Sequence, residues 1–311
     1  MDGSVSAREN QLRRLQLAQG IHRVVIDTDT FNEIDDQFAL IYALQSTESI
    51  EVEGIYAAPF FNRLASDARD GMLKSYGEIV RILELLDRPA AGLVYHGSEG
   101  FLEDPKSPRG SAAAQALIAR ALQSTGEPLY VIAIGALTNV ASAILMEPRI
   151  IENMVVVWLG GHALHWPHAR EFNLQEDLWA AQLVFNCGVP LVHIPCLGVA
   201  SHLQVTLSEL ATYVKGQGRA GDYLYETYAN SQEDHFGFSR VIWDIAPVAF
   251  LINPEWVRTE LQPSPILTDQ MTWSVDAGRH WIRYAVEVNR NAIFRDFYEK
   301  LRSSGSTRTL N

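Results

Sequence analysis

Short apolar runs alternate with longer segments of helical periodicity up to about residue 200. The apolar runs are rich in β-branched residues and cover residues 23–26, 50–57, 129–134, 154–159 and 191–194. The helical segments between them cover residues 36–46, 65–86, 112–124, 140–146 and 178–185. Strands that alternate with helices of this length predict right-handed crossovers in a mainly parallel sheet. We therefore expect an α/β fold with an open, Rossmann-like sheet and helices on both faces.

The later pattern extends this domain rather than starting a second one. Residues 206–230 and 244–251 have helical patterns, residues 273–288 resemble strands, and residues 291–302 resemble a closing helix. No linker, repeat or low-complexity block separates them from the earlier segments. We expect a single domain over residues 21–302, with residues 206–238 a helical insertion or lid near the site. Residues 1–20 are expected to be a polar N-terminal extension, and residues 303–311 a disordered tail.

Composition and charge narrow the classes of function. Of the 311 residues, 47% are hydrophobic, and the net charge is −12 without any basic cluster. This balance argues against binding to nucleic acid or to an anionic membrane. The two cysteines, Cys187 and Cys196, have apolar neighbours in sequence, which is typical of a reducing compartment rather than of a disulfide framework. Without an apolar signal region or a membrane-length segment, a cytoplasmic protein is expected.

The most informative stretch follows the first apolar run. Four aspartates, Asp27, Asp29, Asp35 and Asp36, stand within ten residues, and an apolar helical pattern then begins. Ligands of open parallel sheets bind beyond the carboxyl ends of the strands. Acids gathered there repel one another unless they are protonated or neutralised, and Ca²⁺ or Mg²⁺ takes oxygen ligands of this kind. Favourable interaction with a helix N-terminus accounts for two of the acids but not for all four.

Polar residues also follow two later strands. Residues 134–139, Ile-Gly-Ala-Leu-Thr-Asn, leave a strand and open a helix, and backbone carbonyls in such a turn can face an ion. After Gly160-Gly161, Glu171 and Asn173 stand on a loop and suit the hydroxyl groups of a sugar. Taken singly, these features also fit a capped helix start and ordinary solvated polar groups.

Two further motifs allow a structural or a functional interpretation. Trp243-Asp244 precedes an apolar helix with Pro247 in its first turn, as an N-cap aspartate does. His96 lies in a loop bounded by glycine and is either a surface residue or a proton shuttle that faces the acidic site.

In this order, the motifs resemble those of the inosine-uridine-type nucleoside hydrolase family over roughly residues 20–300. The resemblance implies hydrolysis of the N-glycosidic bond of ribonucleosides to ribose and free base with one bound Ca²⁺. It implies that Asp29, Asp36 and Asp244 ligate the ion together with the carbonyl of Ile134. Asp29 is also expected to be the base that takes a proton from the calcium-activated water.

The same resemblance assigns supporting roles. Asp35, Glu171 and Asn173 are expected to bind ribose hydroxyls, and Asp27 to orient the acidic loop from behind. His96 matches a loop of the family in order and is expected at the substrate. A small-molecule nucleoside is the expected partner, and homodimers or homotetramers are expected because they are common in the family.

The chain also departs from the family pattern. Five residues, rather than the usual three, separate Asp29 from Asp35, so that Asn32 becomes an additional candidate contact. Asn62 is the candidate substitute for a Gly-Asn that usually follows the second strand. Trp243 stands where many members have a histidine, which resembles the purine-preferring subclass and predicts stacking on a purine-like base. A buried core tryptophan is the alternative.

Two other functions remain open from the sequence. Asp27-Thr28-Asp29-Thr30 resembles the nucleophile motif of haloacid-dehalogenase-like phosphatases, which use Mg²⁺. The expected downstream lysine and remote acidic pair are not found in matching positions. The second alternative is a non-catalytic nucleoside- or sugar-binding relative with a degraded site.

Overall fold

The computed structural model describes residue 9 and residues 11–123 and 126–306. Its centre is an eight-stranded sheet in the order β3-β2-β1-β4-β5-β6-β12-β9. All neighbouring strands are parallel except β12 and β9. The open, mainly parallel sheet is confirmed. The strands are β1 (His22–Thr28), β2 (Ile50–Ala57), β3 (Val94–His96), β4 (Leu129–Ala133), β5 (Met154–Leu159), β6 (Leu191–Ile194), β9 (Val257–Pro263) and β12 (Trp281–Val288).

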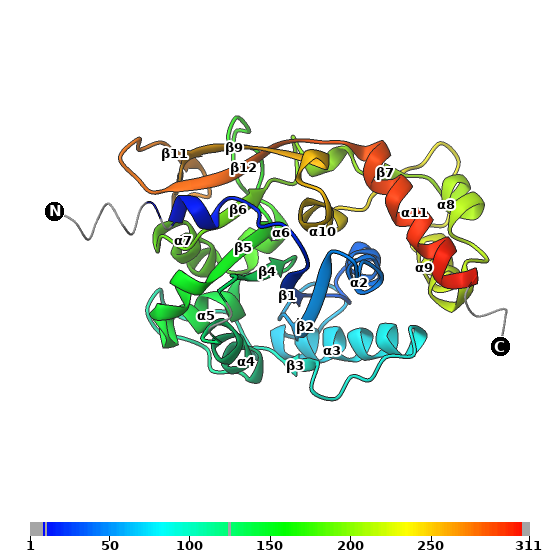
Figure 1. Cartoon of the computed structure of the whole chain (residues 1–311), viewed down its shortest axis with the longest axis horizontal. Helices are drawn as coiled ribbons and strands as arrows, with labels where there is room; N and C mark the ends of the chain where they lie inside the picture. Colours follow the sequence, from blue (N-terminus) through cyan, green and yellow to red (C-terminus); the bar gives the residue numbers. More distant parts are fainter. Residues whose placement is uncertain (1–8, 10, 124–125, 307–311) are drawn as a thin grey trace.

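Helices cover both faces of this sheet (Figure 1). Alternate side chains of a strand point to opposite faces. Accordingly, Val24 and Ile26 of β1 belong to one buried core and Val25 to the other. The first core is covered by α2 (Asp35–Gln45), α3 (Ala68–Leu85), α10 (Ile245–Ile252) and α11 (Arg290–Ser306). The second is covered by α4 (Ala112–Ala121), α5 (Thr138–Met146) and α7 (Leu178–Asn186).

The strand order determines where a ligand can bind. The chain steps outward from β1 to β2 and β3, and it then returns to β4 on the other side of β1. Asp27 near the end of β1 pairs in register with Tyr56 of β2 and with Ala133 of β4. This is the point at which the strand order reverses, where open α/β sheets form their binding crevice. The aspartates after β1 therefore lie at the mouth of that crevice.

The segment expected as an insertion or lid is helical, and none of its residues is in the lining of the acidic pocket. It contains α8 (Leu207–Tyr213) and α9 (Gly218–Asn230) between the short paired strands β7 (Gln204–Val205) and β8 (Arg240–Val241). In Figure 1, α8 and α9 lie beside α11. Leu224 and Tyr228 of α9 are buried in the core shared with α2 and α11. The apolar face of α9 is therefore buried against the body of the domain, and a role of this segment as a lid stays a prediction.

Several boundaries differ from those expected. The helix expected from residue 65 begins at Ala68, because the Asp67 side chain accepts a hydrogen bond from the backbone N–H of Asp70. The strands expected over 273–288 are β11 (Trp273–Ser274), which pairs with β10 (Ile266–Leu267), and β12. The closing helix continues to Ser306, so the expected tail does not begin at residue 303. Its residues 307–311, and residues 1–8 and 10 of the expected N-terminal extension, lie outside the described residues. In the described ranges, no helix combines the length and apolarity needed to cross a membrane.

Candidate active site

Three carboxylates meet at the point where the strand order reverses. Asp35 and Asp36 open α2, and Asp244 immediately precedes α10. One oxygen from each of the three lies within 4.8 Å of the others, and all three side chains are buried. α2 and α10 pack against each other, so Asp244 reaches the other two acids although it is remote in sequence. Donors to the group include the Thr28 hydroxyl to Asp36 and the Trp243 N–H to Asp35.

Electrostatics set this group apart from an ordinary capped helix. Burial and the neighbouring acids raise the pKa values of Asp35 and Asp244 well above their ordinary range. Burial raises the pKa of Asp36 to about 7, although the Thr28 hydroxyl acts in the opposite direction. Ionisation of these carboxyl groups is therefore unfavourable without a cation, and a bound cation would stabilise their charged forms.

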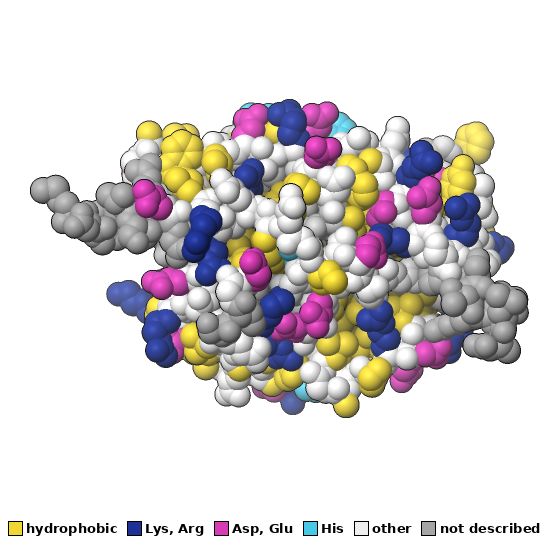
Figure 2. Space-filling view, viewed as in Figure 1, with side chains coloured by type: hydrophobic (Ala, Val, Ile, Leu, Met, Phe, Trp, Pro, Cys, Tyr) yellow, Lys and Arg dark blue, Asp and Glu magenta, His cyan; other side chains and the backbone are white. Residues whose placement is uncertain are grey.

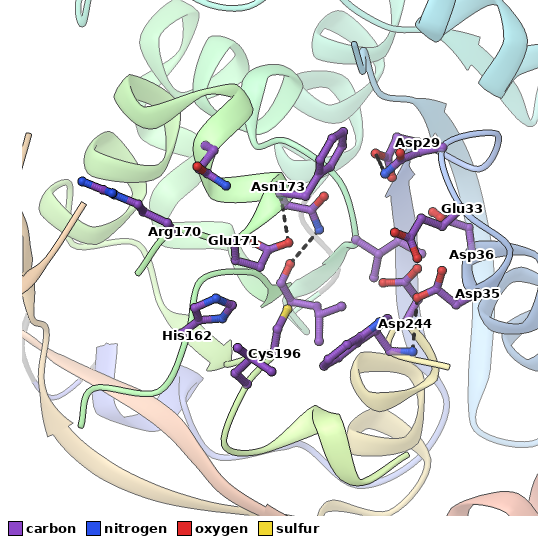
Figure 3. Close-up of a pocket in the computed structure, with 17 residues that line it drawn as sticks. Asp29, Glu33, Asp35, Asp36, His162, Arg170, Glu171, Asn173, Cys196 and Asp244 are labelled. Atoms are coloured by element: carbon purple, nitrogen blue, oxygen red, sulfur yellow. Dashed lines mark hydrogen bonds between the residues drawn. The ribbon is translucent and has the colours of Figure 1, made fainter. Parts of the chain in front are cut away.

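Asp29 lies beside this group rather than within it (Figure 3). Its carboxylate accepts a hydrogen bond from the Asn32 amide at 3.0 Å. The backbone N–H of Asn32 also donates to the carbonyl of Asp29, which closes a tight turn. Burial, followed by the charges of Asp36 and Glu176, raises the pKa of Asp29 well above its usual range. The structure groups Asp35 with Asp36 and Asp244, and the expected role of Asp29 as a metal ligand stays a prediction.

Asp27 does not line the pocket, and its expected role in orienting the acidic loop stays a prediction. One of its oxygens accepts a hydrogen bond from the Asn139 amide at 2.8 Å, and the other is buried without a partner among the described residues. Burial raises the pKa of Asp27 to about 7. Asn139 also accepts the backbone N–H and the hydroxyl of Ser98, which ties β1 to the loop after β3. Asn139 belongs to the 134–139 turn, whose first residue, Ile134, lines the pocket.

The opposite wall is built by α6 (Phe172–Glu176) and the loop before it. Glu171 caps α6, and its carboxylate accepts the backbone N–H groups of Asn173, Leu174 and Gly161. Burial raises the pKa of Glu171 to about 7. The Asn173 amide donates to the Leu159 carbonyl at the end of β5. Glu171 and Asn173 therefore line the pocket in a fixed orientation, as Figure 3 shows.

A pocket of about 320 Å³ separates the two walls. Of the expected site residues, it brings together Asp29, Asn32, Asp35, Asp36, Ile134, Glu171, Asn173, Trp243 and Asp244. Its lining also includes residues that were not expected there: Glu33, Leu159, His162, Arg170, Phe172, Gln175, Cys196 and Leu197. Cys196 is a buried, free thiol beside the acids, so its surroundings are less apolar than its neighbours in sequence indicate.

Two expected substrate residues do not line the pocket. His96 stacks on Tyr76 of α3, with ring centroids 3.8 Å apart, and the expectation that it faces the acids is corrected. Its position at the end of β3, near the edge of the sheet, accounts for the difference. Asn62 acts indirectly: its amide donates to the Asn32 side chain at 2.6 Å, and Asn32 in turn holds Asp29.

Glu176 is a further group that sequence reasoning missed. One of its oxygens accepts the backbone N–H of Phe61 at 2.6 Å, and the other is buried without a partner among the described residues. Burial raises the pKa of Glu176 to about 8. Glu176 lies close to Asp29 because α6 contacts the loop after β2. No pattern in the local sequence indicates that contact.

Comparisons with known proteins identify the family of the chain. Residues 24–295 match the family described as inosine-uridine preferring nucleoside hydrolase. The match covers most of the chain, and the chain belongs to this family. It is therefore a nucleoside hydrolase, an enzyme that cleaves N-glycosidic bonds.

Individual relatives differ in the base they prefer. A pyrimidine-specific ribonucleoside hydrolase, RihA of Salmonella paratyphi B, is 28% identical over 278 residues, which cover 77% of this chain and 84% of that protein. Among solved structures, a plant nucleoside hydrolase (PpNRh1) has a TM-score of 0.72 at 20% identity and covers 91% of this chain and 99% of its own. A purine-preferring ribonucleoside hydrolase from Gardnerella vaginalis has a TM-score of 0.72 at 18% identity and covers 92% and 99%. These structural similarities show the fold.

Proposed function

We propose that the protein hydrolyses ribonucleosides to ribose and free base with one Ca²⁺ held by Asp35, Asp36 and Asp244. The observation that carries the proposal is the group of three buried carboxylates whose oxygens lie within 4.8 Å of one another. Hard oxygen donors at this separation fit a calcium ion. Ile134, whose backbone carbonyl the resemblance assigns to the ion, lines the same pocket. When bound, the ion supplies Lewis-acid chemistry that lowers the pKa of a water molecule.

Asp29 is the proposed base. It is buried beside the ion-binding group, and its raised pKa favours uptake of a proton from the attacking water. Asn32 fixes the orientation of the carboxylate by donating to one of its oxygens. Asn32 therefore helps to hold the carboxylate in one orientation.

Glu171 and Asn173 are the proposed ribose-binding groups on the opposite wall. Their hydrogen bonds to backbone groups fix both side chains before a substrate arrives. Groups held in this way stabilise the positive charge that develops on the sugar without reorganising. Asp35 was expected to bind ribose as well, and its place beside Asp36 and Asp244 supports a role at the ion.

Trp243 is the proposed platform for the leaving base. It is half-buried, packs against the first core and also lines the pocket next to Asp244, so a contact with a ligand would add to its packing role. Phe172 is a second aromatic residue in the lining of the pocket, whereas Tyr95 packs on Tyr56 and Arg120. A purine offers the larger face for stacking, so we propose a preference for purine ribosides. Because curated relatives are pyrimidine-specific, the preference of this protein for inosine or for uridine directly tests the role proposed for Trp243.

The family membership rejects the phosphatase alternative. The geometry gives the physical reason. Asp27, which would be the nucleophile of a phosphatase, is held by Asn139 behind the pocket and cannot reach a substrate there.

Hydrolysis of three substrates tests the proposed function. Calcium-loaded protein is incubated with inosine, uridine and p-nitrophenyl riboside, and the free base and ribose are separated by chromatography. We expect turnover of all three, with inosine ahead of uridine in kcat/KM. Binding of inosine without turnover would instead support a non-catalytic relative, and faster turnover of uridine would reject the purine preference.

A further inference from the structure

His162 is the histidine found in the lining of the acidic pocket. It follows β5 through Gly160-Gly161, and Gly161 has a φ of +66°, a left-handed conformation that favours glycine. The Gly161 N–H donates to Glu171, and the Trp273 indole donates to the carbonyl of His162. The backbone of His162 is therefore fixed on both sides, which places its ring at the pocket wall.

The ring of His162 is buried yet lacks a full set of partners. The residue is only 7% exposed, and its Nδ1 is buried without a hydrogen bond among the described residues. A buried polar nitrogen without a partner is costly to a fold and is a reason to look for a ligand. The neighbouring rings of Trp166 and His168 have centroids 6.4 and 5.6 Å away, and they pack against His162 without closing the pocket.

His162 also lines the pocket that holds the groups proposed to bind the sugar and the base. In Figure 3, His162, Arg170 and Glu171 stand on one side of the pocket, and Asp35, Asp36 and Asp244 stand on the other. Trp243, which is proposed to stack on the leaving base, lines the same pocket as His162. The remaining loop histidines, His165 and His168, are not in its lining.

We propose that His162 donates a proton to the nitrogen of the leaving base. This inference rests on the proposed function of the site and adds the group that activates the leaving group. The C1′–N bond breaks, and its electron pair stays on the base nitrogen, which takes the proton from the His162 imidazolium. The water oxygen bonds to C1′ and gives its proton to Asp29. Solvent then returns a proton to His162 and removes one from Asp29, so atoms and charge balance.

Burial and the nearby His168 support this role by lowering the pKa of His162. A more acidic imidazolium transfers its proton more readily to a weakly basic nitrogen. The chain has Trp243 at the position where a histidine is common in the family, so His162 supplies a proton donor from another strand end.

The test compares two kinds of leaving group. His162→Gln and His162→Asn are assayed with inosine and with p-nitrophenyl riboside, whose phenolate leaves without protonation. The matched control is His165→Gln, a change to an exposed histidine of the same loop. Far-UV circular dichroism and turnover of p-nitrophenyl riboside report whether each variant is folded.

We expect both His162 variants to lose about 100-fold or more in kcat/KM for inosine, within the usual contribution of general acid catalysis. Turnover of p-nitrophenyl riboside should stay within about twofold, as should both activities of His165→Gln. If either His162 variant kept inosine turnover within about twofold, or lost both substrates equally, the inference would be overturned. If the wild type hydrolysed neither substrate, the proposed function itself would fail, which is a distinct result.

Discussion

Stability of the calcium-free protein should fall as the pH rises from 6 to 8. Burial raises the pKa values of Asp27 and Asp36 to about 7. In the unfolded chain both carboxyl groups have pKa values near 3.9, so they carry no protons in this range. The folded protein thus binds more protons than the unfolded chain, and its stability is lost as the pH rises through the folded pKa values.

The change in the free energy of unfolding per pH unit follows from the difference in bound protons between the folded and the unfolded states. At pH 7 each of the two groups is half-protonated in the folded state, and one proton corresponds to about 1.36 kcal/mol per pH unit. Together they lower the free energy of unfolding by about 1.4 kcal/mol per pH unit. Asp35 and Asp244, whose pKa values are also raised, and Glu171 and Glu176, with pKa values of about 7 and about 8, act in the same direction, so this value is a lower bound.

Calcium should reduce this slope. A bound cation keeps Asp36 charged, which removes about 0.7 kcal/mol per pH unit from the slope at pH 7 and leaves the contributions of Asp27, Glu171 and Glu176. Urea unfolding of EDTA-treated and calcium-saturated protein at pH 6, 7 and 8 measures both slopes. Asp36→Asn is the matched variant, and it should flatten the slope of the calcium-free protein. Equal slopes with and without calcium, or stability that rises with pH in EDTA, would refute the reasoning.

Three further predictions concern single side chains. Asp29→Asn should lower kcat by roughly 100-fold to 10,000-fold, since an amide cannot accept the proton of the water. Ribose binding, measured by calorimetry, should survive. Near wild-type turnover would place the base elsewhere. Trp243→Ala should reduce kcat/KM for inosine far more than for p-nitrophenyl riboside, and an equal loss would assign Trp243 to packing alone. Asn139→Ala should destabilise the fold by about 2–4 kcal/mol in urea unfolding, because it leaves Asp27 and the Ser98 N–H unpaired; a loss below about 1 kcal/mol would contradict the support assigned to Asn139.

The sheet and the general place of the site could be predicted from the sequence because both depend on local patterns. The β-branched run before Asp27 and the apolar helix after Asp36 locate the acids at a strand end, and the alternation of strands and helices gives the parallel sheet. Strand β3 was missed because three residues are too few to show a period.

Contacts between remote segments could not be predicted. The grouping of Asp35 with Asp244 depends on the packing of α2 against α10, and the position of Asp29 depends on the shape of the longer loop. His96 appeared suitable from its glycine-bounded loop, but its partner Tyr76 comes from α3. His162 was overlooked as a site residue, although its place directly after Gly160-Gly161 at a strand end is a usable signal.

Hydrolysis of inosine by protein stripped of metal tests the central claim most directly. The protein is dialysed against EDTA, its residual metal is measured by elemental analysis, and release of ribose and hypoxanthine is followed before and after Ca²⁺ is restored. The account predicts that activity disappears with the metal and returns with about one equivalent of Ca²⁺, and that Asp36→Asn and Asp244→Asn do not recover. Full activity in EDTA, with far less than one divalent ion per chain, would contradict it.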